Sequence, residues 1–264
     1  MLANLRRLVR YRGLIQTLVT RELKARYRAS VLGFLWSFIN PLLLLTVYTI
    51  VFTVVLPGFR GNDVEPYALF LFCGLLPWTW FSSALLESSD SLIAGGNLIK
   101  KVLFPAEILP IVAVLSNMFH FFFALPVLAL FLAFYARPLQ LTELAWFPVV
   151  VVIQLTLTLG IGLMLSALTV HFRDLRDLLG NLLTLWFFST PIIYPMAMVP
   201  SGGKVIMDLN PVAHLAISYQ EILFYDGPFG HWRWLLALGV FSVVTLLVGY
   251  ALFDRLRDSF AEEV

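Results

Sequence analysis

The ionisable side chains that stand within apolar sequence are few, and they are the first candidates for chemistry. Glu87 and Asp90 lie near the end of one apolar segment, Glu107 lies at the start of the next, and His120 lies deep inside it. A charge in lipid is costly, so such groups are functional candidates by default. We interpret the three carboxylates as interfacial groups that pair with nearby lysines or a partner's cation, with gating as the alternative. His120 has no carboxylate at matching depth in another segment, which favours helix packing over a proton relay.

Motifs that would bind a nucleotide or break a bond are missing from the sequence. No G-x-x-x-x-G-K-[ST] occurs, because the single Gly-Lys pair is followed by Val205. Neither G-x-S-x-G nor H-E-x-x-H is present. We therefore predict no catalytic residue, no metal site and no cofactor in this chain. A membrane enzyme that uses Glu87, Asp90 and His171 on polyprenyl lipids is the less favoured alternative.

The composition predicts what surrounds these groups. Residues of the set AVILMFWYC make up 60% of the 264-residue chain and charged residues only 13%, against about 45–50% and about 25% in soluble domains. A water-soluble fold cannot bury so much apolar surface, so most of the chain is expected to lie in lipid. Its one cysteine, Cys73, excludes an intrachain disulfide.

Six apolar segments are long enough to cross a bilayer as helices, which takes about 20 residues each. Strand periodicity is absent from them, and a helix satisfies its own backbone in lipid. We therefore predict an all-α membrane protein with a single membrane domain over residues 1–264. The predicted transmembrane helices are 32–56, 67–86, 106–135, 144–170, 178–199 and 232–253.

Positive charge orients these helices. Eight Lys and Arg residues precede the first helix, and pairs follow the second, fourth and sixth, whereas the loops of the opposite side hold four in all. By the positive-inside rule both termini are cytoplasmic, which predicts a multi-pass protein of the cytoplasmic (inner) membrane.

Two segments outside the six helices are predicted to lie at the membrane surfaces. Residues 1–30 form a cytoplasmic segment that begins with a basic amphipathic helix, suited to anionic lipid headgroups. Residues 197–231 on the outer side are too polar to span and predict re-entrant or interfacial helices, entered at Asn210-Pro211. The arginines of the amphipathic helix are Arg6, Arg7, Arg10 and Arg12.

Five stretches are the most specific part of the sequence. They are TRELKARYRASVLGFLWSFINPLL from Thr20, NLIKKVLFPAEILP from Asn97, HFRDLRDL from His171, STPIIYP from Ser189 and LNPVAHLAISYQEILF from Leu209. Together and in this order they resemble the membrane subunits of type-two ABC exporters for polysaccharides, the O-antigen, teichoic-acid and capsule export permeases. The resemblance covers residues 5–257.

The resemblance implies a transport subunit rather than an enzyme, and it implies partners. Two copies of the chain would pair with two copies of a separate ATPase, which would bind the ATP and Mg that this chain does not. The cargo would be a glycan on polyprenyl diphosphate, as in lipopolysaccharide biosynthesis, and its headgroup would meet the four arginines of the amphipathic helix. No nucleic acid is expected. An ABC exporter of a small hydrophobic compound or lipid is the alternative.

The resemblance also assigns residues to two roles. It implies that residues 21–30 and 95–104 dock onto the ATPase, and that helices one and five face the dimer axis. Aromatic rings there would let sugars slide with little orientation demand, although rings in membrane helices also pack or anchor. The implied ATPase contacts are Arg21, Glu22, Lys24, Arg26, Tyr27, Asn97, Lys100, Lys101, Phe104 and Glu107. The implied path residues are Phe34 and Trp36 at the inner mouth, then Tyr48, Phe52, Trp186, Phe187, Phe188 and Tyr194.

Overall fold

The computed structural model describes residues 11–26, 32–56, 64–101, 105–135 and 140–263, and within these ranges it contains helices but no strand. The all-α prediction is confirmed. The longer helices are α2 (Arg12–Arg26), α3 (Trp36–Ile50), α4 (Tyr67–Ala94), α6 (Ile108–Phe134), α8 (Phe147–His171), α9 (Leu175–Phe188), α10 (Ser201–Leu209), α11 (Pro211–Leu223) and α12 (Trp232–Leu256). The shorter pieces are η1 (Gly33–Leu35), η2 (Val51–Val55), α5 (Gly96–Lys101), α7 (Leu141–Leu144), η4 (Met196–Met198), η5 (Arg257–Ser259) and α13 (Phe260–Glu263).

Five helices of the described chain are long and apolar enough to cross a membrane. They correspond to the first, second, third, fourth and sixth predicted spans, and they are Trp36–Val55, Tyr67–Ala94, Ile108–Phe134, Leu141–His171 and Trp232–Ser259.

The predicted fifth span, 178–199, is not a single helix. Helix α9 has 14 residues and ends at Phe188, a length of about 21 Å. The hydroxyls of Ser189 and Thr190 then bond back to carbonyls of the last helical turn, and Pro191 follows. Proline has no N–H to donate and disfavours helical backbone in the residue before it, so the chain leaves the helix here.

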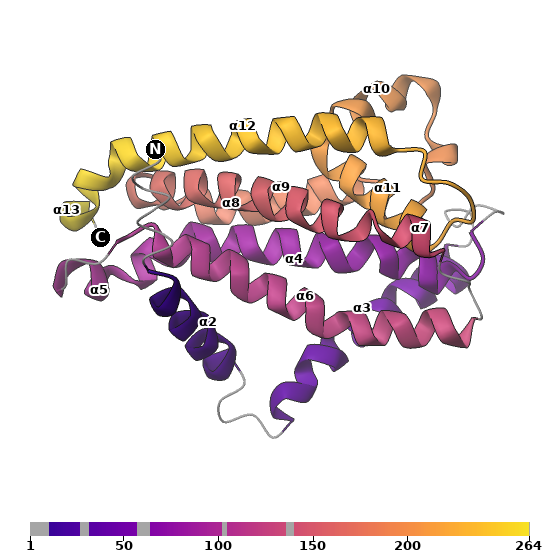
Figure 1. Cartoon of the computed structure of the whole chain (residues 1–264), viewed down its shortest axis with the longest axis horizontal. Coiled ribbons are helices and arrows are strands. Elements are labelled where there is room, and N and C mark those ends of the chain that lie inside the picture. The colour runs from indigo at the N-terminus through magenta and orange to yellow at the C-terminus, as the bar shows by residue number, and fades with distance from the viewer. Residues whose placement is uncertain (1–10, 27–31, 57–63, 102–104, 136–139, 264) are drawn as a thin grey trace.

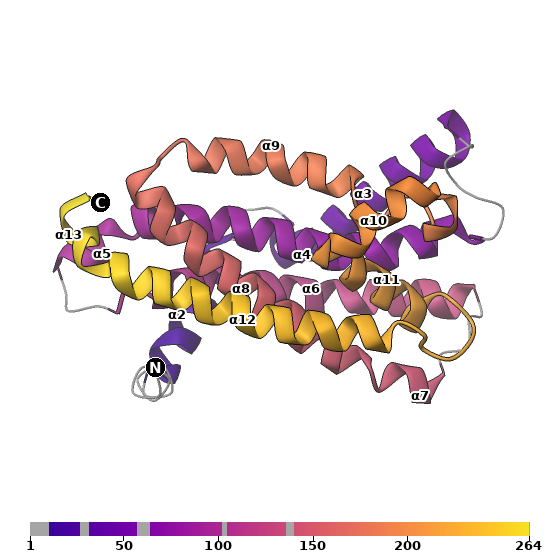
Figure 2. The same ribbon diagram turned by 90° about the horizontal axis from the view of Figure 1, so that it is seen from above.

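Helix α4 is the centre of the bundle. It packs against α6, α8 and α11 and also contacts α3 and α9. Figure 1 shows α4, α6, α8 and α12 lying lengthwise beside one another, and Figure 2 shows α9 along one edge. In the most apolar window of α4, 78% of the residues are buried, against 11% for the α3 span and 22% for α12. Helix α4 is buried because other helices surround most of it, whereas α3 and α12 present one side outward.

Two glycines allow α8 and α12 to touch through their backbones. A Cβ at Gly160 of α8 would lie 2.6 Å from the backbone nitrogen of Leu246, and one at Gly249 of α12 would lie 2.2 Å from the carbonyl oxygen of Gly160. Small residues at helix contacts let membrane helices approach closely. These positions therefore require glycine.

Segment 197–231 contains helices α10 and α11, and α11 begins at the predicted entry, directly after Asn210. The Asn210 side chain accepts hydrogen bonds from the backbone N–H groups of Val212 and Ala213, at 3.0 and 3.3 Å. It thereby caps α11, whose first helical residue is Pro211. Helix α11 is largely buried against α4, α8 and α12. Its position in the membrane stays a prediction.

The N-terminal arginines Arg6, Arg7 and Arg10 lie outside the described residues, as do Tyr27 and Phe104. The described part of the basic segment is α2, which begins at Arg12. Its residue Val19 is buried with Ile108 and Val112 of α6. The second half of this segment therefore packs on the bundle through an apolar face.

Candidate functional site

Three carboxylates at the end of the bundle that holds α5 and α13, the α5 end, each bind an arginine from elsewhere in the chain. Glu87 of α4 pairs with Arg26 at the end of α2 and also accepts a hydrogen bond from Asn117 Nδ2 of α6 at 2.6 Å. Arg26 and Glu87 are 61 residues apart in sequence. The pair therefore fastens α2 to the α4 and α6 helices.

The other two carboxylates bind later segments. Asp90 Oδ1 of α4 lies 3.2 Å from Arg176 Nη1 of α9. Glu107, immediately before α6, has a side chain only 3% exposed, and its Oε2 lies 3.8 Å from Arg257 Nη1 of η5. Helix α4 and the residue before α6 thus supply the acids, and α2, α9 and η5 supply the cations.

This arrangement confirms that the carboxylates pair with cations. The described partners are arginines distant in sequence, and pairing with Lys100 or Lys101 stays a prediction because those side chains lie outside the description. The sequence singled out the three acids, because charges inside apolar segments stand out, and it singled out Arg26 as an ATPase contact, but it did not indicate which cation pairs with which acid. The ties would carry a displacement of the α4–α6 connection to three other segments.

The residues implied as ATPase contacts occupy different environments. Arg21, Glu22 and Lys24 are exposed on α2, and Asn97 is exposed on α5. Lys100 and Lys101 belong to α5, but their side chains are not described. Arg26 and Glu107 instead take part in the ties, Arg26 with a partly exposed side chain and Glu107 with a buried one.

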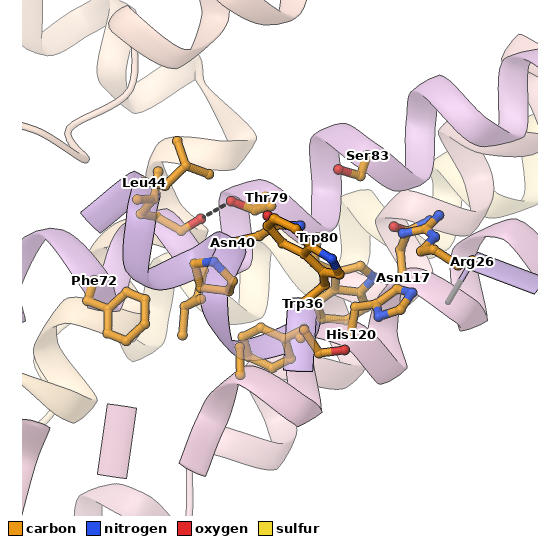
Figure 3. Close-up of a pocket in the computed structure, with 16 residues that line it drawn as sticks. Arg26, Trp36, Asn40, Leu44, Phe72, Thr79, Trp80, Ser83, Asn117 and His120 are labelled. Atoms are coloured by element: carbon orange, nitrogen blue, oxygen red, sulfur yellow. Dashed lines mark hydrogen bonds between the residues drawn. The ribbon is translucent and has the colours of Figure 1, made fainter. Parts of the chain in front are cut away.

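A crevice of about 370 Å³ lies between α3, α4 and α6. Figure 3 shows Arg26, Asn117 and His120 at one end of it, and Leu44 and Phe72 at the other. Its polarity therefore changes along its length, as a site for an amphiphile would require. Apart from Trp36, no motif in the sequence predicted this crevice, since its lining is assembled from separate helices by their packing.

Trp36, implied as a residue of the inner mouth, lines this crevice. The side chain of Phe34, its implied companion, lies outside the description. The buried indole nitrogen of Trp80, also in the lining, is a donor for which the described residues provide no hydrogen-bond acceptor.

The implied path aromatics form one cluster where α3 meets α9. The rings of Tyr48 and Phe52 stack with centroids 6.2 Å apart, which confirms that they share a helix face, and Tyr48 also packs on Phe187 at 5.6 Å. Phe52 and Phe187 are buried within the subunit, while Phe188 is 53% exposed. Of these rings, Phe188 is the one that points most clearly away from the bundle.

The remaining two aromatics brace the chain after α9. Trp186 Nε1 donates to Asn210 Oδ1 at 2.8 Å, and the hydroxyl of Tyr194 donates to the carbonyl oxygen of Phe188 at 3.0 Å. Both side chains are partly exposed. They connect the end of α9 to the α10–α11 segment.

A histidine pair at the opposite end of the bundle was not predicted. Nδ1 of the buried His214 lies 2.9 Å from Nε2 of His231, and His214 Nε2 donates to the carbonyl oxygen of Asp208 at 2.9 Å. His214 must therefore accept at Nδ1 from His231. Burial, with His214 as a second cause, lowers the pKa of His231 to about 4. Burial also raises the pKa of Glu221, whose Oε2 accepts from the N–H groups of Gly230 and His231.

The described chain is thus a set of long apolar helices that arginine–carboxylate pairs tie together at the α5 end. The chain belongs to the ABC-2 type transporter membrane family, whose sequence pattern matches residues 13–224. It is thus a multi-pass membrane protein and a transporter subunit rather than an enzyme.

Individual relatives are similar along their whole length. The chain is 43% identical to the O-antigen export system permease protein RfbA of Myxococcus xanthus over 100% of both chains. It is 34% identical to the protein of the same name from Klebsiella pneumoniae over 94% of each. The polysialic acid transport protein KpsM of Escherichia coli is 24% identical over 92% of this chain and 93% of its own.

Proposed function

We propose that this chain is the permease subunit of an ABC transporter that exports a polysaccharide across the cytoplasmic (inner) membrane. The observation that carries the proposal is the match to relatives named as O-antigen export permeases over 94% or more of both chains. The cargo we propose is a glycan, O-antigen or teichoic-acid-like, carried on polyprenyl diphosphate.

The energy would come from two copies of a separate ATPase that bind ATP and Mg. Their docking surface on this chain would be α2 and α5, on the cytoplasmic side. The exposed residues Arg21, Glu22, Lys24 and Asn97 support this assignment, since a protein contact needs accessible side chains. The three arginine ties would pass a tilt of α5 on to α2, α9 and α12.

The transporter would contain two copies of this chain, with the glycan passing between them along α3 and α9. The outward side of this surface is apolar and largely unpacked within the subunit, which supports a contact with a second copy. Its exposed apolar residues are Leu43, Leu44, Val47, Ile50 and Val54 on α3, with Leu178, Leu182, Leu185 and Phe188 on α9. Phe188 would become accessible to sugars when the copies separate, whereas Phe187 lies buried beside Tyr48 and would be reached only if α3 moved away from α9.

A depletion experiment tests the proposal. Removal of the chain from its own cell should abolish the glycan at the cell surface and cause polyprenyl-linked glycan to accumulate inside. Purification of the tagged chain in mild detergent should bring down an ATPase in equal amount, and ATP hydrolysis should depend on both proteins.

The control is a complementing copy with Phe134→Ala, since Phe134 is 82% exposed at the far end of α6 and touches none of the ties. This variant should restore surface glycan fully. If surface glycan is unchanged by depletion while a small lipid or hydrophobic compound is retained, the chain exports that compound instead. A chain that binds no ATPase in its intact membrane complex would refute the proposal.

A further inference from the structure

The chain turns back under the bundle after its last spanning helix. Helix α12 passes through η5 into α13, and α13 packs against α5 and α8. Figures 1 and 2 both show α13 beside α5 at the same end of the molecule. The C-terminal segment, defined here as Arg257–Glu263, therefore lies at the place where the ATPase is proposed to bind.

An aromatic side chain holds this segment in position. Phe260 is 1% exposed, and its ring meets that of Phe253 edge-on at 5.1 Å. It belongs to a buried cluster with Leu92 of α4 and Ala106 of the connection before α6. The burial of Phe260 in this cluster fixes the segment to the fold.

Polar contacts join the same segment to both connections at the α5 end. Arg257 reaches the buried Glu107 of the α4–α6 connection at 3.8 Å. Ser259 Oγ lies 3.1 Å from Nε2 of His171, which ends α8, and Arg173 Nη2 donates to the backbone oxygen of Glu263 at 3.5 Å. The segment thus bridges the connection that contains α5 and the connection between α8 and α9.

Helix α5 needs support from the rest of the fold. It has six residues, too few to be stable as an isolated helix. Among the described elements its main neighbours are α4, from which it continues through Gly95, and α13. Within the described part of the chain, α13 is therefore a main support of α5.

We propose that the C-terminal segment positions α5 for its contact with the ATPase, with Phe260 and Arg257 as the positioning residues. This inference rests on the proposed function, because it assigns a role within the same coupling surface. A push on α5 would pass through Phe260 to α12 and through Ser259 to α8, in addition to the direct route along α4. The segment would therefore set how much of each ATP-driven movement reaches the spanning helices.

The test places a spin label on α5 through Asn97→Cys, since Asn97 is exposed and the native Cys73 is fully buried. Phe260→Ala is then compared with Phe134→Ala in the purified permease and in the complex with its ATPase. We expect Phe260→Ala to raise the mobility of the label and to lower the glycan exported per ATP hydrolysed by about five-fold or more. The Phe134→Ala control should leave both unchanged.

A second pair of variants tests the same proposal if Phe260→Ala does not fold. Arg257→Gln should act in the same direction, and Arg257→Lys, which keeps the charge near Glu107, should recover part of the loss. Unchanged label mobility in both Phe260→Ala and Arg257→Gln would overturn the proposal, and so would increased mobility with unchanged export per ATP. A wild-type permease that binds no ATPase would refute the proposed function instead, while the label would still show whether the segment holds α5.

Discussion

The contact between α8 and α12 gives a prediction whose size follows from the geometry. In Gly249→Ala the new Cβ would fall 2.2 Å from the carbonyl oxygen of Gly160 and 3.0 Å from its carbonyl carbon. A carbon and a carbonyl oxygen normally lie about 3.3 Å apart or more. The obstacle is backbone on a packed helix, so no side-chain rotation can relieve it, and the helices must separate by roughly 1 Å.

Two opposing terms set the expected change in stability. Overpacking of this kind costs about 1–3 kcal/mol, and the rigid backbone contact favours the upper end. Alanine regains about 0.8–1 kcal/mol over glycine in helix propensity. The net loss is about 2 kcal/mol, which corresponds to roughly 4–8 °C in melting temperature for a chain of this size.

The assay is the melting temperature of the purified permease in detergent, followed by size-exclusion chromatography after heating. Gly239→Ala is the matched control on the same helix, because its Cβ would meet Ile153 Cδ1 at an ordinary 3.4 Å. We expect Gly239→Ala to melt at or above the wild-type temperature. If Gly249→Ala melts within about 1 °C of Gly239→Ala, the backbone contact does not constrain these helices and the reasoning is wrong.

Three further predictions concern other parts of the chain. The pKa of His231 is lowered to about 4 in the folded protein, so between about pH 6.5 and pH 4 the unfolded chain binds more protons than the folded one. The melting temperature should therefore fall as the pH is lowered from 6.5 towards 4, and His231→Gln should flatten this profile. Asn210→Ala should lower stability by about 1–2 kcal/mol through loss of the α11 cap, whereas Asn210→Asp should keep most of it, as thermal melts will report. Asp90→Arg should reduce export, and adding Arg176→Asp should restore it, while melting temperatures change little because the pair is partly exposed.

The spanning helices were largely predictable from sequence because hydropathy is a local property. Five of six predicted segments coincide with long apolar helices. The exception, 178–199, is equally apolar, but its middle holds Ser189, Thr190 and Pro191. Hydropathy ignores the missing N–H of proline and the hydroxyls that bond back to the helix end, so it could not place the end of α9.

The candidate site was predictable in its residue types but not in its pairings. A carboxylate within apolar sequence predicts a cationic partner, and the structure supplies one for Glu87, Asp90 and Glu107. The identity of each partner depends on how helices pack, which no local pattern encodes. The aromatic cluster was likewise predictable only in part. The four-residue spacing of Tyr48 and Phe52 predicts that they share a helix face. Burial of Phe187 beside exposed Phe188 depends on α3 lying against α9.

The strengths of these contacts separate the parts of the permease that move from those that do not. Helices α8 and α12 meet at Gly160 and Gly249 through backbone, and most of α4 is buried, so relative motion there would open voids in a close-packed interior. Helices α2 and α9 pack on the bundle through one apolar face each, and their polar ties are the partly exposed pairs of Arg26 and Arg176, each worth no more than about 1 kcal/mol. Such pairs can break and re-form within a transport cycle at little energetic cost. A conduit that opens along α3 and α9 is therefore compatible with α4, α6, α8 and α12 moving together as one rigid body when the ATPase acts on the α5 end.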